Sequence, residues 1–144
     1  MPQKEKVPRA LVDWLVLVVD DEEDSLEVAQ LLLEMAGATV LTAMTGREAL
    51  EIIRQRRPHF ILSDLSMPEV DGWRLVYNLN RDRTTLDIPV IALTAHAISG
   101  DRERALKAGF ANYITKPLDP DKFIQQLLKL LVEIPELSAM LATE

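Results

Sequence analysis

The stretch LVLVVDD (residues 15–21) decides the fold of this chain, because an uninterrupted aliphatic run ends there in two carboxylates. Such a run is typical of a β-strand that is covered on both faces. Three further apolar runs also end in a side chain that could take part in chemistry: HFILS before Asp64, VIAL before Thr94 and ANYIT before Lys116-Pro117. In a parallel α/β sheet the carboxyl ends of the strands lie along one edge, where ligands bind. These side chains are therefore predicted to converge.

The remaining sequence alternates strand and helix signals five times. Strands are predicted over residues 15–19, 39–43, 59–63, 89–93 and 111–115, and helices from about 24 to 36, 45 to 57, 72 to 81, 97 to 108 and 119 to 132. Gly37 ends the first helix, Thr45 and Glu48 form a capping box, and Asp119-Pro120 reads as a helix start. Short connections between such elements favour right-handed crossovers. The predicted fold class is α/β: a five-stranded parallel sheet with helices on both faces, flavodoxin-like and doubly wound.

Composition limits the function. A chain of 144 residues suits one domain, and a net charge of −7 argues against a nucleic-acid-binding face. There is no cysteine, so disulfides and thiolate metal sites are excluded. Basic residues precede the apolar stretch 11–19 as in a secretory signal, but Asp13 interrupts it and acidic residues 20–24 follow it. We expect a cytoplasmic protein without membrane insertion, with a flexible leader (1–13), a main domain (14–133) and a short tail (134–144).

Asp20, Asp21 and Asp64 would form a cluster of three carboxylates at the predicted edge. Taken alone, an acidic run is more often a solvated loop, and an Asp after a strand is often a turn residue. Placed together, the carboxylates repel one another, and a hard divalent cation relieves that repulsion. Magnesium favours one or two carboxylates together with water and phosphate oxygens. The cluster therefore predicts a Mg²⁺ site in which Asp64 is a candidate nucleophile.

Two other strand ends add donors to the same place. The hydroxyl of Thr94 could donate to a phosphoryl oxygen, and the small Ala95 beside it leaves access open. The ammonium of Lys116 would offset the carboxylates and then pair with a transferred phosphoryl group. The Lys116-Pro117 peptide is a candidate cis bond. His59 and His96 are isolated, so neither is interpreted as a metal ligand, and Trp14 is expected at a strand edge.

The motifs VVDDE, LSDLSMPEVDGW, IALTA and YITKPLD, in this order, resemble the receiver domain of bacterial two-component response regulators. The resemblance covers roughly residues 14–132. It implies that Asp64 is the phosphoacceptor and that Asp20 and Asp21 position Mg²⁺, together with the backbone carbonyl of Ser66. It also implies contacts between the phosphoryl group and Thr94, Ala95 and Lys116, and a switch in which Tyr113 rotates as Thr94 moves.

The resemblance further implies a signalling protein that catalyses only its own phosphoryl transfer and dephosphorylation, with a histidine kinase or phosphotransfer protein as donor. Few residues follow the last predicted helix, so output is expected through an unidentified downstream protein, or a homodimer through the fourth helix, fifth strand and fifth helix, rather than through DNA. The chain could also be a receiver piece of a larger regulator or hybrid kinase. Two rivals are a haloacid-dehalogenase-like phosphatase, disfavoured because Ser66 replaces its second Asp, and a phosphate-independent interaction module.

Overall fold

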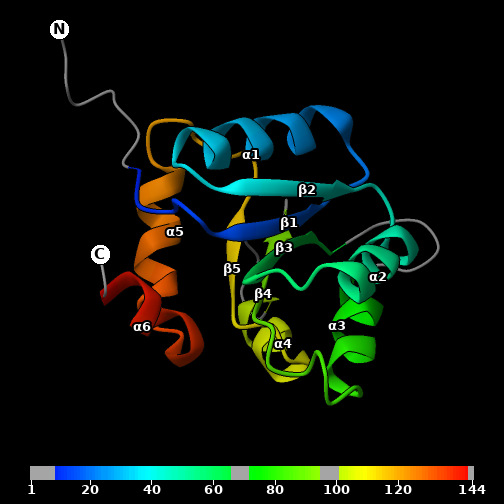
Figure 1. Cartoon of the computed structure of the whole chain (residues 1–144). Helices are drawn as coiled ribbons and strands as arrows, with labels where there is room; N and C mark the ends of the chain where they lie inside the picture. The colour runs from blue at the N-terminus through cyan, green and yellow to red at the C-terminus, as the bar shows by residue number, and fades with distance from the viewer. Residues whose placement is uncertain (1–8, 66–71, 95–100, 143–144) are drawn as a thin grey trace, which may run out of the picture.

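The structure is a computed structural model that describes residues 9–65, 72–94 and 101–142. The strands are β1 (Leu15–Val19), β2 (Thr39–Ala43), β3 (Phe60–Asp64), β4 (Val90–Thr94) and β5 (Asn112–Thr115). The helices are α1 (Glu23–Met35), α2 (Gly46–Gln55), α3 (Gly72–Asn80), α4 (Asp101–Ala108), α5 (Phe123–Leu131) and α6 (Pro135–Ala142). The strands form one parallel sheet in the order β2-β1-β3-β4-β5 (Figure 1). The predicted fold class is confirmed.

Two hydrophobic layers lie on opposite faces of the sheet. Alternate residues of a strand point to opposite faces, so Val16 and Val18 of β1 pack in one layer, and Leu17 and Val19 pack in the other. α1 and α5 cover the first face, and α2, α3 and α4 cover the second (Figure 1). Because β1, β3 and β4 are buried between these layers, their carboxyl ends are held at fixed positions along one edge.

Local signals set several helix ends as predicted. Gly37 has a φ of +100°, a left-handed conformation that favours glycine, and it follows the last turn of α1. The hydroxyl of Thr45 accepts a hydrogen bond from the backbone N–H of Glu48 at 3.1 Å, which caps α2. The returning bond differs from a standard capping box, because the carboxylate of Glu48 accepts from the N–H of Met44 at 2.9 Å.

The predicted start of the fifth helix is wrong by about one turn. α5 begins at Phe123, and Asp119-Pro120 forms a separate turn before it. The carbonyl of Asp119 accepts from the N–H groups of Lys122 and Phe123, and its side chain accepts from the N–H of Asp121 at 3.0 Å. Asp119 therefore caps a turn that precedes the helix.

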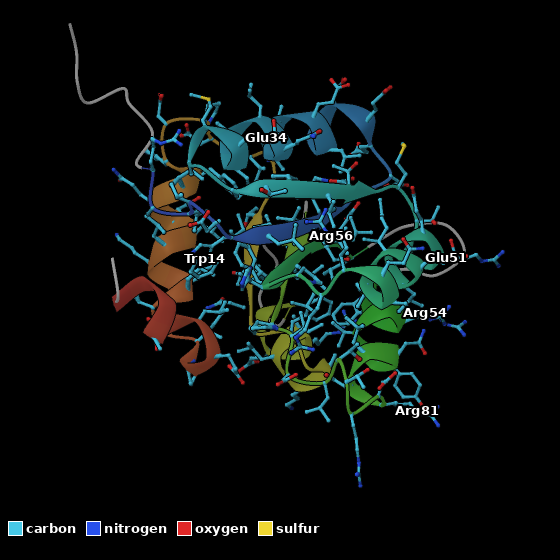
Figure 2. All side chains as sticks on the ribbon, in the orientation of Figure 1. Trp14, Glu34, Glu51, Arg54, Arg56 and Arg81 are labelled. Atoms are coloured by element: carbon cyan, nitrogen blue, oxygen red, sulfur yellow. The ribbon has the colours of Figure 1, made fainter. Side chains whose placement is uncertain are left out.

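Trp14 directly precedes β1 and lies in the packed core. Its side chain is 1% exposed, and its ring meets that of Phe60 edge-on with 5.8 Å between centroids (Figure 2). Leu11 is also fully buried, and its N–H donates to the carbonyl of Ala36 at 2.9 Å. At the other end, Leu137 of α6 is buried in the same layer. The packed core therefore includes residues on both sides of the limits 14–133.

Candidate functional site

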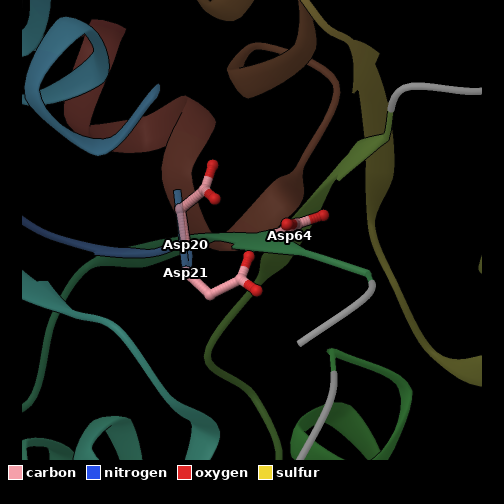
Figure 3. A group of neighbouring side chains, drawn as sticks. All are labelled: Asp20, Asp21 and Asp64. Atoms are coloured by element: carbon pink, nitrogen blue, oxygen red, sulfur yellow. The ribbon is translucent and has the colours of Figure 1, made fainter. Parts of the chain in front are cut away.

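Three carboxylates lie together at the carboxyl edge of the sheet. Asp64 ends β3, and Asp20 and Asp21 directly follow β1, its neighbour in the sheet. One oxygen from each of the three lies within 4.8 Å of the others, and Figure 3 shows the three side chains beside one another at the neighbouring ends of β1 and β3. The convergence follows from parallel strand pairing, because Val19 is paired with Ser63.

Backbone hydrogen bonds fix the first carboxylate. The N–H of Asp20 donates to the carbonyl of Ala43 at 3.0 Å, which extends the pairing of β1 with β2. One side-chain oxygen, Oδ1, accepts from the N–H of Glu22 at 2.9 Å. Asp20 is fully buried and Asp64 is 8% exposed, whereas Asp21 is the most accessible of the three. The buried pair has a fixed geometry, and Asp21 lies on the solvent side.

Gly72 brings the start of α3 into contact with the end of β3. A Cβ atom at this position would lie 2.3 Å from the carbonyl oxygen of Asp64 and 2.9 Å from the Cα of Leu65. The N–H of Gly72 donates to the carbonyl of Leu65 at 3.1 Å. No side chain fits here without moving the backbone that carries Asp64.

Lys116 reaches the carboxylates from the end of β5. Its Nζ lies 3.1 Å from Oδ2 of Asp20, 2.9 Å from Oε1 of Glu22 and 3.6 Å from Oδ2 of Asp64. The side chain of Lys116 is only 9% exposed. Burial opposes its charge, but hydrogen bonds to Glu22 and Asp20 and the negative charges of Asp20 and Asp64 outweigh burial, so the pKa of Lys116 is raised. The lysine is therefore held charged beside Asp64.

Glu22 contacts Lys116, and the sequence analysis did not predict this contact. Its hydrogen bond with Lys116, followed by the charge of that lysine, lowers the pKa of Glu22. The structure shows what orients Glu22: it stands two residues after Asp20, and its N–H bonds to the side chain of that aspartate. Within a run of five acidic residues, however, nothing in the sequence distinguishes it from its neighbours.

The remaining candidates lie on β4 and β5 or outside the described residues. Thr94 ends β4, is 5% exposed, and its carbonyl accepts from the N–H of Lys116 at 2.7 Å. The Lys116-Pro117 peptide is cis, as predicted. Tyr113 is half-buried against the layer that contains α3 and α4. Ser66, Ala95 and His96 lie outside the described residues.

The histidine within the described region has a structural contact. Nδ1 of His59 accepts a hydrogen bond from the N–H of Leu15 at 2.8 Å, and the ring lies 5.7 Å from that of Trp14. A neutral histidine whose Nδ1 accepts carries its proton on Nε2, so neither nitrogen offers a free lone pair to a metal.

The donor set fits a hard divalent cation. Carboxylate oxygens are the ligands that Mg²⁺ prefers, and three of them within 4.8 Å repel one another unless a cation or proton offsets their charge. Lys116 supplies one positive charge on the side of Asp20 and Asp64.

Among the described residues, no helix is long and apolar enough to cross a lipid bilayer.

Comparisons with known proteins agree with this geometry. The family model described as "Response regulator receiver domain" matches residues 16–128. The polar-differentiation response regulator DivK of Brucella anthropi is 38% identical over 112 residues, covering 78% of this chain and 91% of DivK.

Solved structures show the same similarity. The receiver domain of a histidine kinase from Syntrophus aciditrophicus is 32% identical with a TM-score of 0.73, covering 84% of this chain and 92% of that domain. The chemotaxis response regulator CheY4 of Vibrio cholerae is 27% identical with a TM-score of 0.77, covering 84% of this chain and 99% of CheY4. The chain therefore belongs to the family of response regulator receiver domains, which act in two-component signalling.

Proposed function

We propose that this chain is a phosphorylation-activated switch in which Asp64 accepts a phosphoryl group from a phosphohistidine. The donor is a histidine kinase or a histidine phosphotransfer protein. The observation that supports this most directly is the position of Lys116, whose Nζ lies 3.6 Å from Oδ2 of Asp64 in a site with three clustered carboxylates. A nucleophile, a fixed cation and a set of metal ligands are thus assembled at one point.

In the transfer step, a carboxylate oxygen of Asp64 attacks phosphorus. The new P–O bond gives an aspartyl phosphate, while the P–N bond to the donor histidine breaks and its electron pair returns to the imidazole. Mg²⁺ held by Asp20, Asp21, Asp64 and the carbonyl of Ser66 would neutralise charge on the transferring group. Lys116 places its positive charge beside Asp64 before transfer and can then pair with a phosphoryl oxygen.

Thr94 and Ala95 are proposed to complete the phosphoryl site. Thr94 is buried at the end of β4, on the strand that neighbours β3, so its hydroxyl can donate to a phosphoryl oxygen on Asp64. Ala95 follows it in the chain, and a side chain as small as that of alanine would leave room for the incoming group. The phosphoryl group adds negative charge and strong acceptors, which bias a two-state element.

The readout of this change is proposed to pass through Tyr113 to protein contacts. A groove of about 480 Å³ lies between β5 and α5, and its walls include Tyr113, Gln126 and Lys129. A shift of Thr94 with rotation of Tyr113 would reshape this groove, which suits a downstream protein or a second copy of the chain. Slow hydrolysis of the aspartyl phosphate resets the site, so the chain serves signalling and not substrate turnover.

Phosphate incorporation from acetyl phosphate tests the proposal, because this donor needs no partner protein. Intact mass should show one phosphate per chain in the presence of Mg²⁺, none with EDTA, and none in Asp64→Asn. Asp87→Asn is the matched control, since Asp87 is an exposed carboxylate paired with Arg57 away from the site. If the folded protein is labelled neither by acetyl phosphate nor by any of a panel of phosphorylated kinases, the switch proposal is contradicted. A phosphate-independent interaction module would then be the favoured function.

A further inference from the structure

A hollow of about 310 Å³ lies between α2 and α3, toward the ends of both helices. Leu50 and Ile53 of α2 and Leu79 of α3 form its apolar walls, and the other lining residues are polar: Arg54, Asn78, Asp82 and Thr85. Helices that connect parallel strands run back from the carboxyl edge of the sheet to its amino edge, so this hollow lies at the edge opposite Asp64. Apolar walls with a few polar groups are typical of a binding site.

Arginines gather around the hollow. Five exposed arginines stand in the last turn of α2 or α3 or directly after it: Arg54, Arg56, Arg57, Arg81 and Arg83. Figure 2 shows Arg54 and Arg81 on the same side of the molecule. The first part of the chain is different, because it has no lysine or arginine from residue 10 to residue 46. In a chain with a net charge of −7, these arginines make the ends of α2 and α3 a local positive surface.

The two nearby carboxylates are already engaged within the protein. Oδ1 of Asp82 accepts hydrogen bonds from the N–H and the hydroxyl of Thr84 at 2.8 and 2.7 Å, so this side chain is held in its own turn. The carboxylate of Asp87 is paired with Arg57 at 2.7 Å. Neither acid is therefore positioned to cancel the charge of all the arginines beside it.

Arg81 is held in place by an aromatic ring. Its guanidinium lies 5.2 Å from the centroid of the Tyr77 ring, and Nη1 donates to the hydroxyl of that tyrosine at 3.2 Å. A guanidinium has five N–H donors, so others remain to bind an acceptor. Because the side chain is already ordered, binding through Arg81 costs less conformational entropy than binding through a loose cation.

We propose that this hollow is a docking site for an acidic segment of another protein. One aliphatic side chain of that segment would insert between α2 and α3, and its carboxylates would pair with Arg54 and Arg81. The apolar walls favour a protein segment over a nucleic acid, because phosphates and sugars would leave those walls without a partner. The proposal does not depend on phosphoryl transfer, since the hollow lies at the edge of the sheet opposite Asp64.

A peptide-binding measurement tests the charge requirement. The probe is a short fluorescein-labelled peptide with one leucine among aspartates and glutamates, and binding is followed by fluorescence anisotropy. Arg54→Glu should weaken binding at least about tenfold, because an attractive pair becomes a repulsive one. The matched control is Lys122→Glu, which changes the net charge equally at an exposed position before α5. Equal loss in the two variants would mean general repulsion and would overturn the proposal, as would the absence of saturable binding by the wild type.

The apolar part of the site is tested without changing charge. Replacing the leucine of the peptide by serine should weaken binding to the wild type about tenfold or more, as expected when a buried leucine is lost. Asn78→Trp places a large ring at the hollow, so this variant should bind the leucine and serine peptides equally. Gln125→Trp, at an exposed position of α5, is the control and should still prefer the leucine peptide. A wild type that binds both peptides equally would contradict insertion of a side chain.

Two other occupants would overturn the proposal. One is a nucleic acid, shown by a single-stranded oligonucleotide of equal charge that binds more tightly than the peptide and loses affinity in Arg54→Glu. The other is a second copy of this chain, shown by sedimentation of a wild-type dimer that Arg54→Glu dissociates. Labelling of Arg54→Glu by acetyl phosphate should match that of the wild type, so failure of docking is distinct from failure of the switch.

Discussion

Nζ of Lys116 lies 3.1 Å from Oδ2 of Asp20, although 96 positions separate the two residues in the chain. Asp20 is fully buried, and its charge is met by this ammonium and by the N–H of Glu22. The contact joins the end of β5 to the end of β1, two strands that are not neighbours in the sheet. The same ammonium also lies near Glu22 and Asp64, so it offsets part of the negative charge of the site.

Removing the lysine charge should therefore destabilise the protein. Lys116→Met leaves the buried Asp20 without its cation, and we expect a loss of about 2 kcal/mol in the free energy of unfolding. Urea denaturation without Mg²⁺ measures this loss, and added Mg²⁺ should recover part of it. Lys129→Met, an exposed lysine of α5, is the control and should change stability little. An unchanged stability of Lys116→Met would contradict this account.

The pair formed by Glu22 and Lys116 predicts a pH window. The folded pKa of Glu22 lies below its ordinary value of 4.5, so its contribution is present above that value and is lost as pH falls through the folded pKa. The folded pKa of Lys116 lies above 10.5, so its contribution is present below that value and is lost as pH rises through the folded pKa.

The difference in unfolding free energy between wild type and Glu22→Gln should consequently be largest between about pH 5 and pH 10, and it should shrink below and above that range. Urea unfolding across a pH series checks this, with Glu51→Gln on the exposed side of α2 as control. A difference that stays constant with pH would argue against the ion pair.

Neutralising Asp21 should stabilise the protein in the absence of metal. Three carboxylates within 4.8 Å repel one another, so Asp21→Asn should raise the free energy of unfolding by an amount on the order of 1 kcal/mol. The same variant should lose most of the thermal stabilisation that Mg²⁺ gives the wild type. Asp24→Asn, at the start of α1, should change neither quantity by as much. If Mg²⁺ stabilises Asp21→Asn as much as it stabilises the wild type, Asp21 is not part of the metal site.

Adding a methyl group at Gly72 should disturb both folding and the site. The new Cβ would lie 2.3 Å from the carbonyl oxygen of Asp64, so the backbone must shift. We expect Gly72→Ala to cost about 2 kcal/mol in stability and to weaken Mg²⁺ binding, because the displaced backbone carries a ligand. Urea denaturation and a Mg²⁺ titration measure the two effects. A variant that loses stability but keeps its Mg²⁺ affinity would show that Gly72 matters for packing alone.

Trp73 offers an optical test of coupling between α3 and α4. Its ring meets Phe110 edge-on at 5.5 Å, and the guanidinium of Arg104 on α4 lies 5.3 Å from the ring centroid. If phosphorylation moves α4, the fluorescence of Trp73 should change when acetyl phosphate and Mg²⁺ are added. Trp14→Phe leaves Trp73 as the single tryptophan, which can be excited selectively at 295 nm or longer wavelengths, and adding Asp64→Asn should abolish the change. A response that persists without Asp64 would not report phosphorylation.

Much of the fold and part of the site could be predicted, because both depend on strand periodicity. β2 spans the predicted residues, and β3 differs by one residue at each end. Parallel pairing then necessarily brings Asp20 and Asp64 to the same edge. The apolar pattern and the polar residue that ends it are both local features of sequence.

Contacts between distant segments could not be predicted in this way. Leu11 is buried in the core layer that contains α1 and α5, and its N–H bonds to the carbonyl of Ala36 at the end of α1, but no local pattern separates it from a loose leader. Trp14 precedes β1, and its burial depends on Phe60 in the next strand of the sheet. Glu22 gains its contact only because the fold brings Lys116, at the end of β5, beside the residues that follow β1. Asp119 was misassigned for a different reason: an Asp-Pro pair can cap either a turn or a helix, and here it caps a turn.

The two carboxylates that hold Lys116 most closely differ in their exposure to solvent. Glu22 has a side chain that is 65% exposed, whereas that of Asp20 is fully buried. Dissolved ions screen the attraction to Glu22 and leave the attraction to Asp20 almost unaffected. Rising ionic strength therefore releases the lysine from the outer carboxylate while it remains anchored at the inner one. The readiness of the ammonium to move toward a phosphoryl group is thereby tied to the salt content of its surroundings.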